Sequence, residues 1–134
     1  MNPSNTAKLF AAYPLLYRNL REFGFECGNG WFNLVWQLSA DVEAAARIEG
    51  VPETAERWPS VTILKQKFGA LRVNFEGSVS EHILTLANEA GERSIETCES
   101  CGASAKLENY GKWVKVLCEK CRIKQPSAKQ PQDK

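Results

Sequence analysis

Residue types that build most catalytic sites are scarce in this sequence of 134 residues. His82 is its only histidine, and Asp41 and Asp133 are its only aspartates. No glycine-rich phosphate-binding motif is present. The chain also has no run of about 18 uncharged apolar residues, the length that a membrane-spanning helix requires. Its first six residues show no basic region followed by an apolar run, so we expect a cytoplasmic protein with reduced thiols.

The sequence also lacks a large excess of charge of either sign. Its net charge is +1 at pH 7. Residues 1–97 hold 9 Lys/Arg against 12 Asp/Glu, whereas residues 98–134 hold 8 against 4. The chain therefore has a basic C-terminal part on a mildly acidic body. This excess is weak beside that of dedicated nucleic-acid-binding proteins, so it allows phosphate contacts without requiring them.

Hydrophobic periodicity predicts an α+β body of three helices packed on a β-hairpin, followed by a C-terminal metal-binding module. The expected helices cover residues 7–20, 31–48 and 78–96, and the hairpin covers residues 61–75. Asn5 or Ser4 can cap the first helix. Within that helix, Pro14 either introduces a kink or separates two short turns, because proline lacks the backbone N–H that a helix interior needs.

Local signals set the expected boundaries of the later elements. The apolar stripe of the second helix runs from Trp31 to Ile48 and leaves Glu43 on another face. The segment Ser78–Glu81 has the spacing of a capping box, which predicts the start of the third helix. Apolar residues alternate with polar ones in both strands of the hairpin, and the turn is expected at Gly69, which can adopt positive φ.

The most specific pattern is formed by four of the five cysteines. Cys98 and Cys101 form one C-x-x-C pair, and Cys118 and Cys121 form a second pair after 16 intervening residues. Two intervening residues let both thiolates of a tight knuckle face one ion, and two knuckles complete a tetrahedron. The sequence therefore predicts one structural Zn²⁺. Disulfides, a redox C-x-x-C pair and an iron–sulfur cluster fit this spacing and compartment less well.

The residues around these cysteines predict a zinc ribbon over residues 98–123. Two strands are expected at 103–107 and 112–117, with a turn at 108–111. Residues 1–97 then form the α+β body. The segment 124–134 is rich in lysine, glutamine and proline and is expected to be disordered.

The fifth cysteine, Cys27, has two interpretations. It is a nucleophile near the start of the Trp31 helix, or it is a small buried residue beside a glycine turn. A nucleophile needs a base, and His82 is the only histidine available. No residue supplies a third group that orients such a base, so the sequence favours a protein that is not an enzyme.

Three sets of surface candidates remain. At the hairpin turn, Lys65, Lys67, Phe68 and Arg72 either contact a partner or form a charged strand edge that discourages aggregation. Trp58 lies in a connection, where it either fills the core or anchors a partner. In the ribbon, the expected nucleic-acid contacts are an aromatic residue for base stacking and cations for phosphates: Trp113, Lys106, Lys112, Lys115, Lys120 and Arg122. Trp113 alternatively covers the small core of the ribbon.

Three segments together carry a resemblance: Glu26-Cys27-Gly28-Asn29-Gly30-Trp31, Lys65-Gln66-Lys67-Phe68-Gly69-Ala70-Leu71-Arg72, and the cysteine pairs with Trp113 between them. In these segments the chain resembles a set of small bacterial and prophage-encoded proteins with a terminal zinc-binding part. The resemblance implies an accessory protein of phages or mobile elements and supplies no catalytic residue. We therefore expect a non-catalytic protein that engages a host or toxin protein, of inhibitor, immunity or adaptor type. Regulation through nucleic-acid binding is the alternative, and the sequence does not set the oligomeric state.

Overall fold

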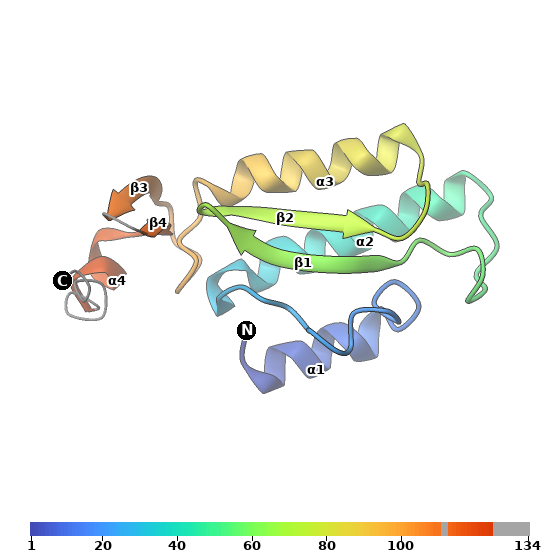
Figure 1. Cartoon of the computed structure of the whole chain (residues 1–134), viewed down its shortest axis with the longest axis horizontal. Helices are drawn as coiled ribbons and strands as arrows, with labels where there is room; N and C mark the ends of the chain where they lie inside the picture. The colour runs from blue at the N-terminus through green and yellow to red at the C-terminus, as the bar shows by residue number, and fades with distance from the viewer. Residues whose placement is uncertain (111–112, 125–134) are drawn as a thin grey trace.

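The computed structural model describes residues 1–110 and 113–124. These residues form an α+β body with a smaller two-stranded unit at one end of its long axis (Figure 1). The elements in chain order are α1 (Pro3–Ala12), a 3-10 turn η1 (Asn29–Trp31), α2 (Phe32–Ile48), β1 (Val61–Lys67), β2 (Ala70–Phe75), α3 (Glu81–Ser94), β3 (Lys106–Tyr110), β4 (Trp113–Leu117) and α4 (Glu119–Lys124). The predicted α+β class is confirmed for these residues.

The first helix is shorter and begins earlier than the sequence predicts. Asn2 caps α1, because its side chain accepts a hydrogen bond from the backbone N–H of Asn5 at 2.8 Å, and Pro3 occupies the first turn. The helix ends before Pro14, whose ring and missing N–H exclude it from a helix interior. Residues 14–19 form turns, so the predicted helix over residues 7–20 is wrong and the division at Pro14 is the correct alternative.

The second and third helices lie close to their predicted positions. In α2, Val35, Leu38 and Val42 are buried as expected, but Ile48 is 87% exposed and Glu43 is buried, which corrects the predicted faces at both positions. In α3 the capping residue is Ser80, whose hydroxyl accepts a hydrogen bond from the N–H of Ile83 at 3.1 Å. The predicted capping box beginning at residue 78 is therefore wrong: the cap lies two residues later, and Ile83 stands where a capping box needs Glu or Gln.

The predicted hairpin is confirmed, with β1 and β2 antiparallel and Lys67 opposite Ala70. Its two turn residues, Phe68 at φ 54° and Gly69 at φ 87°, both have positive φ, which is the signature of a type I′ turn. Leu64 and Leu71 are buried on one face of the hairpin.

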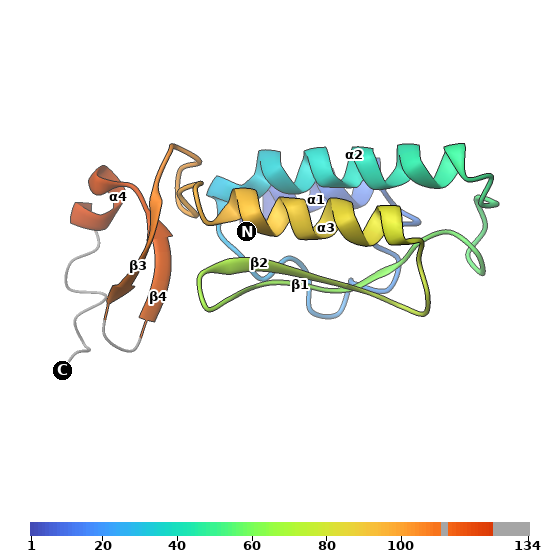
Figure 2. The same ribbon diagram turned by 90° about the horizontal axis from the view of Figure 1, so that it is seen from above.

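The body has two layers, and its core lies between them. The helices α2 and α3 run antiparallel along one face of the hairpin, and no helix covers the other face (Figure 2). The segment around Glu26 runs beside β1 and pairs with Lys65. The core is a single cluster of buried side chains that includes Trp31, Tyr17, Leu20, Leu64 and Ile83. Each helix among the described residues is too short or too polar to span a bilayer.

The smaller unit is a second antiparallel hairpin, β3–β4, followed by α4. Its first strand begins at Lys106, three residues later than predicted, because residues 98–105 form the first cysteine loop and its exit. An isolated bridge between Thr97 and Ser104 closes that loop. The predicted disordered tail lies outside the described residues, except for Lys124 at the end of α4.

Candidate metal centre

The first pair of cysteines lies in a loop that begins soon after α3 ends. The N–H of Cys98 donates to the carbonyl of Ala103 at 2.7 Å, and the N–H of Gly102 donates to the carbonyl of Cys98 at 2.8 Å. Gly102 has φ 87°, a conformation that a side chain disfavours. These bonds fold residues 98–102 into a tight knuckle that turns both thiols to the same side.

The second pair lies where β4 passes into α4. Cys118 follows the last residue of β4, and Cys121 lies in the first turn of α4. The N–H of Cys121 donates to the sulfur of Cys118 at 3.4 Å, and the N–H of Arg122 donates to the carbonyl of Cys118 at 2.9 Å. A backbone N–H that points at sulfur stabilises the thiolate, which is the form that binds a metal.

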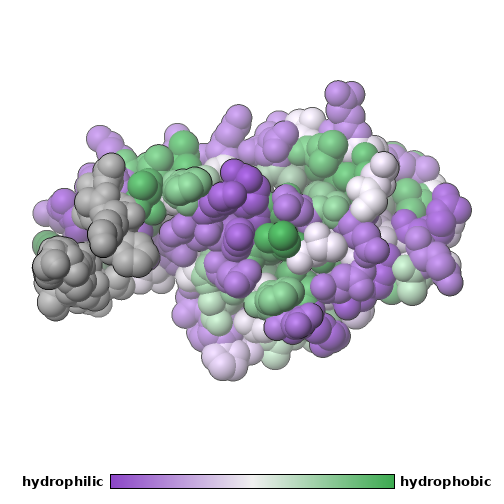
Figure 3. Space-filling model, viewed as in Figure 1, coloured by the Kyte–Doolittle hydropathy of each residue, from purple (hydrophilic) through white to green (hydrophobic). Residues whose placement is uncertain are grey.

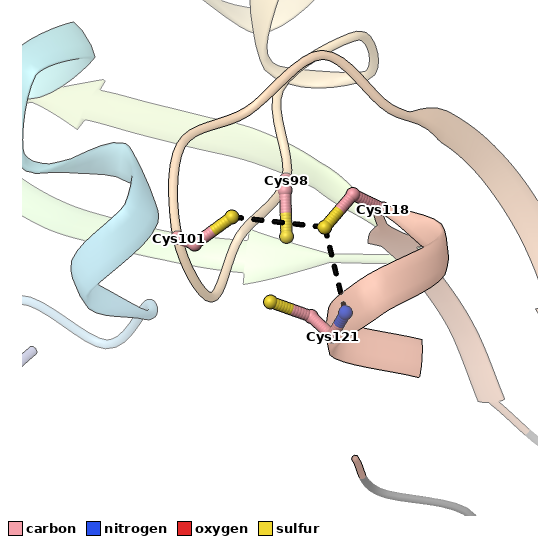
Figure 4. Close-up of side chains that lie close together, drawn as sticks. All are labelled: Cys98, Cys101, Cys118 and Cys121. Carbon is pink, nitrogen blue, oxygen red and sulfur yellow. Dashed lines mark hydrogen bonds between the residues drawn. The ribbon is translucent and has the colours of Figure 1, made fainter. Parts of the chain in front are cut away.

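The four sulfur atoms converge on one point (Figure 4). All four lie within 4.8 Å of one another, and the sulfurs of Cys101 and Cys118 are 3.7 Å apart. A regular tetrahedron with metal–sulfur bonds of about 2.3 Å has sulfur–sulfur edges of about 3.8 Å. A disulfide bond is about 2.05 Å long, so this pair is far outside bonding distance. The geometry therefore fits a four-thiolate metal site and excludes a disulfide between Cys101 and Cys118.

The thiols of Cys98 and Cys121 ionise at different pH within this cluster. Burial disfavours the thiolate of Cys98, but backbone N–H groups of Cys118, Cys101 and Ser100 outweigh it and lower its pKa to about 7. Burial, together with the neighbouring thiol groups, raises the pKa of Cys121 to about 12. Four thiolates this close repel one another, and a divalent cation removes that repulsion.

The first knuckle packs directly on the glycine segment of the body. The N–H of Gly30 donates to the carbonyl of Glu99 at 2.7 Å, and the N–H of Gly28 donates to the carboxylate of Glu99 at 3.1 Å. The indole N–H of Trp31 donates to the carbonyl of Thr97 at 2.9 Å. A Cβ added at Gly30 would lie 2.6 Å from the carbonyl carbon of Glu99, so only glycine allows this approach. The segment Glu26–Trp31 therefore docks the cysteine knuckle on the body.

The tip of the β1–β2 hairpin makes a second contact with the smaller unit. A Cβ added at Gly69 would lie 3.1 Å from Cγ1 of Val114 and well inside contact distance of the side chain of Leu107. The glycine-containing segments Glu26–Trp31 and Lys65–Arg72 thus both touch the cysteine-containing unit. This contact role was not among the predictions from the sequence. The signal that could have revealed it was the close spacing of Gly28, Gly30 and Trp31.

Of the candidate partner contacts, the structure leaves the hairpin residues on the surface and buries Trp58. Phe68 is 74% exposed, and Lys67 and Arg72 are exposed. Trp58 is 2% exposed, and its indole N–H donates to the buried carboxylate of Glu43 at 3.1 Å. The expected partner contact at Trp58 is therefore corrected: this side chain fills the core, where its polar group finds a partner.

The described ribbon cations do not form one continuous row. Arg122 forms an ion pair with Glu108 at 3.7 Å, and Lys115 is half-buried beside a shallow hollow that Glu99 also lines. Lys106 and Lys120 are exposed. Lys112 lies outside the described residues. The backbone of Trp113 opens β4, but its side chain is not described, so its predicted stacking role stays a prediction.

Cys27 is buried, and burial raises the pKa of its thiol to about 12. It adjoins Gly28, which contacts the knuckle beyond the C-terminal end of α3. His82 lies in the first turn of α3, a helix of 14 residues. At about 1.5 Å per residue the helix separates the two by about 20 Å. The structure therefore does not bring together the only cysteine–histidine pair that the sequence offered.

A hollow of about 610 Å³ lies between the connection 51–60 and the start of α3. Several of its polar groups have partners within the chain. The guanidinium of Arg18 donates to the carbonyls of Leu15 and Trp58 at 2.6 and 2.8 Å, and the hydroxyl of Ser80 donates to Glu49 at 2.7 Å. These bonds hold the walls of the hollow in place.

Comparisons with family models, with curated proteins and with solved structures give no match to this chain.

Proposed function

We propose that Cys98, Cys101, Cys118 and Cys121 hold one structural Zn²⁺ ion and that residues 98–123 form a zinc ribbon. Four thiolates select Zn²⁺ over Mg²⁺ and Ca²⁺, which prefer oxygen ligands. The sulfur–sulfur distance of 3.7 Å agrees with zinc–thiolate geometry. Four protein ligands fill the coordination sphere, so the ion stabilises the fold and presents no open position for a substrate.

We further propose that the chain is a non-catalytic binding protein, an accessory product of a phage or mobile element that engages a host or toxin protein. The observation that carries this proposal is the docking of the cysteine knuckle on the glycine segment through Gly28, Gly30 and Trp31. It joins the ribbon to the body, and their shared end carries the exposed Phe68. A rigid platform of this kind lowers the entropic cost of binding a macromolecule.

The metal is tested by elemental analysis of the purified chain and by chelation. We expect one zinc per chain. We also expect that a chelator abolishes the hydrogen-exchange protection of β3 and β4, because a module this small has no core of its own. Cys118→Ser should reproduce the effect. A metal-free chain with unchanged protection of both strands contradicts the zinc assignment.

The binding function is tested by crosslinking in cells, with Phe68→Asn as the variant and the doubly substituted Lys8→Glu/Arg57→Glu chain as the control. Lys8 and Arg57 are exposed, and neither belongs to the β1–β2 hairpin that carries Phe68. We expect a protein that the wild type and the control capture and that the Phe68 variant loses. Capture that is identical in all three chains, or capture of nucleic acid alone, contradicts the proposal.

A further inference from the structure

The face of the β1–β2 hairpin that no helix covers carries three cations. Lys65 lies directly opposite Arg72 in the register, and Lys67 lies two residues further along β1 on the same face. Like charges directly opposite each other destabilise a hairpin. Among the described residues none of the three forms an ion pair. This arrangement opposes folding. Glu26 lies beside Lys65 through a backbone bridge, but among the described residues no carboxylate lies within ion-pair distance of the three cations.

An exposed apolar pair adjoins these cations at the hairpin tip. Phe68 is 74% exposed and has φ 54°, a conformation that bulky side chains disfavour and that Asn or Gly adopts readily. Leu107 of β3 is 42% exposed and packs against Gly69, the other residue of the turn. Apolar surface therefore gathers beside hydrophilic surface where the ribbon meets the hairpin (Figure 3). The body contributes Phe68 to this apolar pair, and the ribbon contributes Leu107.

We propose that this hairpin-tip surface, formed by Lys65, Lys67, Phe68, Arg72 and Leu107, binds an acidic segment of a partner protein. An apolar side chain of that segment packs against Phe68 and Leu107, and its carboxylates face the three cations. The inference rests on the proposed binding function and specifies the chemistry of the partner. It accounts for the strained exposed aromatic side chain and for like charges that have no ion-pair partner among the described residues, because the partner supplies contacts that the isolated chain lacks.

The same surface fits nucleic acid less well. Single-stranded nucleic acid requires successive aromatic platforms along a continuous basic track. Among described side chains this surface has one aromatic ring, Phe68, and Lys67 lies with its ammonium 5.9 Å from the centre of that ring. The backbone of the acidic residue Glu26 lies beside that of Lys65 along the edge of β1, and the cation Arg122 of the ribbon already forms an ion pair with Glu108, so no continuous basic track extends from this surface. The aliphatic side chain of Leu107 suits an apolar protein side chain.

The test is a selection from a random peptide library against the zinc-loaded full chain, followed by affinity measurements. We expect enriched peptides in which Asp and Glu surround an apolar residue. Their affinity should fall at least tenfold for Lys65→Glu/Arg72→Glu and for Phe68→Asn. It should change less than about twofold for the charge-matched control Lys8→Glu/Arg57→Glu. Phe68→Asn relieves the turn strain, so lost binding in that variant does not reflect unfolding.

Three results overturn the inference. The first is enrichment of peptides without acidic residues, the second is equal affinity in the two surface variants and the wild type, and the third is tighter binding of oligo-dT than of any peptide. The cellular crosslinking experiment separates this inference from the proposed function. A captured partner that depends on Phe68 but not on Lys65 and Arg72 supports the binding function and refutes the acidic segment. If no captured protein depends on Phe68, the binding function itself is refuted.

Discussion

Gly30→Ala is the sharpest test of how the ribbon is held on the body. Gly30 does not have positive φ, so the backbone accepts alanine without strain. The added Cβ would lie 2.6 Å from the carbonyl carbon of Glu99, and real Cβ contacts are not that short. The substitution therefore acts through the contact between body and knuckle.

The expected loss follows from the two ways in which the chain can respond. Shifting the backbone to accept a methyl group in a packed contact costs about 1–3 kcal/mol. Releasing the knuckle instead loses the hydrogen bonds from Gly28, Gly30 and Trp31, at about 1 kcal/mol each and more for the carboxylate acceptor. The chain takes the cheaper response, so we expect the free energy of unfolding to fall by about 1–3 kcal/mol.

The assay is urea denaturation followed by tryptophan fluorescence, with the zinc content measured in parallel. A loss of this size lowers the midpoint by about 0.5–1.5 M when the slope is about 2 kcal/mol/M. Zinc content should stay at one per chain, since no ligand changes. Gly91→Ala is the matched control: its Cβ would lie 3.2 Å from the carbonyl of Leu71, and alanine favours the helix by about 1 kcal/mol. An unchanged midpoint for Gly30→Ala refutes the docking argument.

Three further predictions follow from buried or strained groups. Trp58→Phe removes the donor to Glu43 and should lower the free energy of unfolding by about 1–3 kcal/mol in urea denaturation, because a buried carboxylate loses a partner; an unchanged value contradicts this role. The thiol of Cys27 should resist iodoacetamide at pH 8 in the native state. The pKa of this thiol is about 12 in the folded chain against 9.0 for an unperturbed cysteine. The free energy of unfolding of the wild type should therefore fall with rising pH between 9 and 12 more steeply than that of Cys27→Ala. Equal slopes for the two chains contradict the raised pKa. Phe68→Asn should raise the free energy of unfolding by about 1 kcal/mol, since Asn tolerates positive φ; a lower melting temperature than the wild type excludes turn strain.

Features that depend on near neighbours in the chain were predictable. Each C-x-x-C pair encodes its own knuckle, because two intervening residues fix the relative direction of the thiols. The hairpin was predictable from its alternation and from Gly69. The boundaries of the helices were less predictable, because several local signals compete there. Asn2 caps α1 in place of Asn5 or Ser4, and Ser80 caps α3 in place of the capping box at residue 78. The segment before each helix offers several side chains that can cap it, and packing selects among them.

The sequence by itself indicated that four cysteines gather at one point where they could hold a metal ion, since the spacing of each pair fixes its geometry within a few residues. Only the tertiary structure decided what surrounds that site. The bond between Gly28 and Glu99 joins residues 71 apart, and the bond between Trp31 and Thr97 joins residues 66 apart. No periodicity or spacing encodes such contacts, because they exist only after α2, α3 and the hairpin have packed. For the same reason the burial of Trp58 against Glu43 could not be decided from the chain alone.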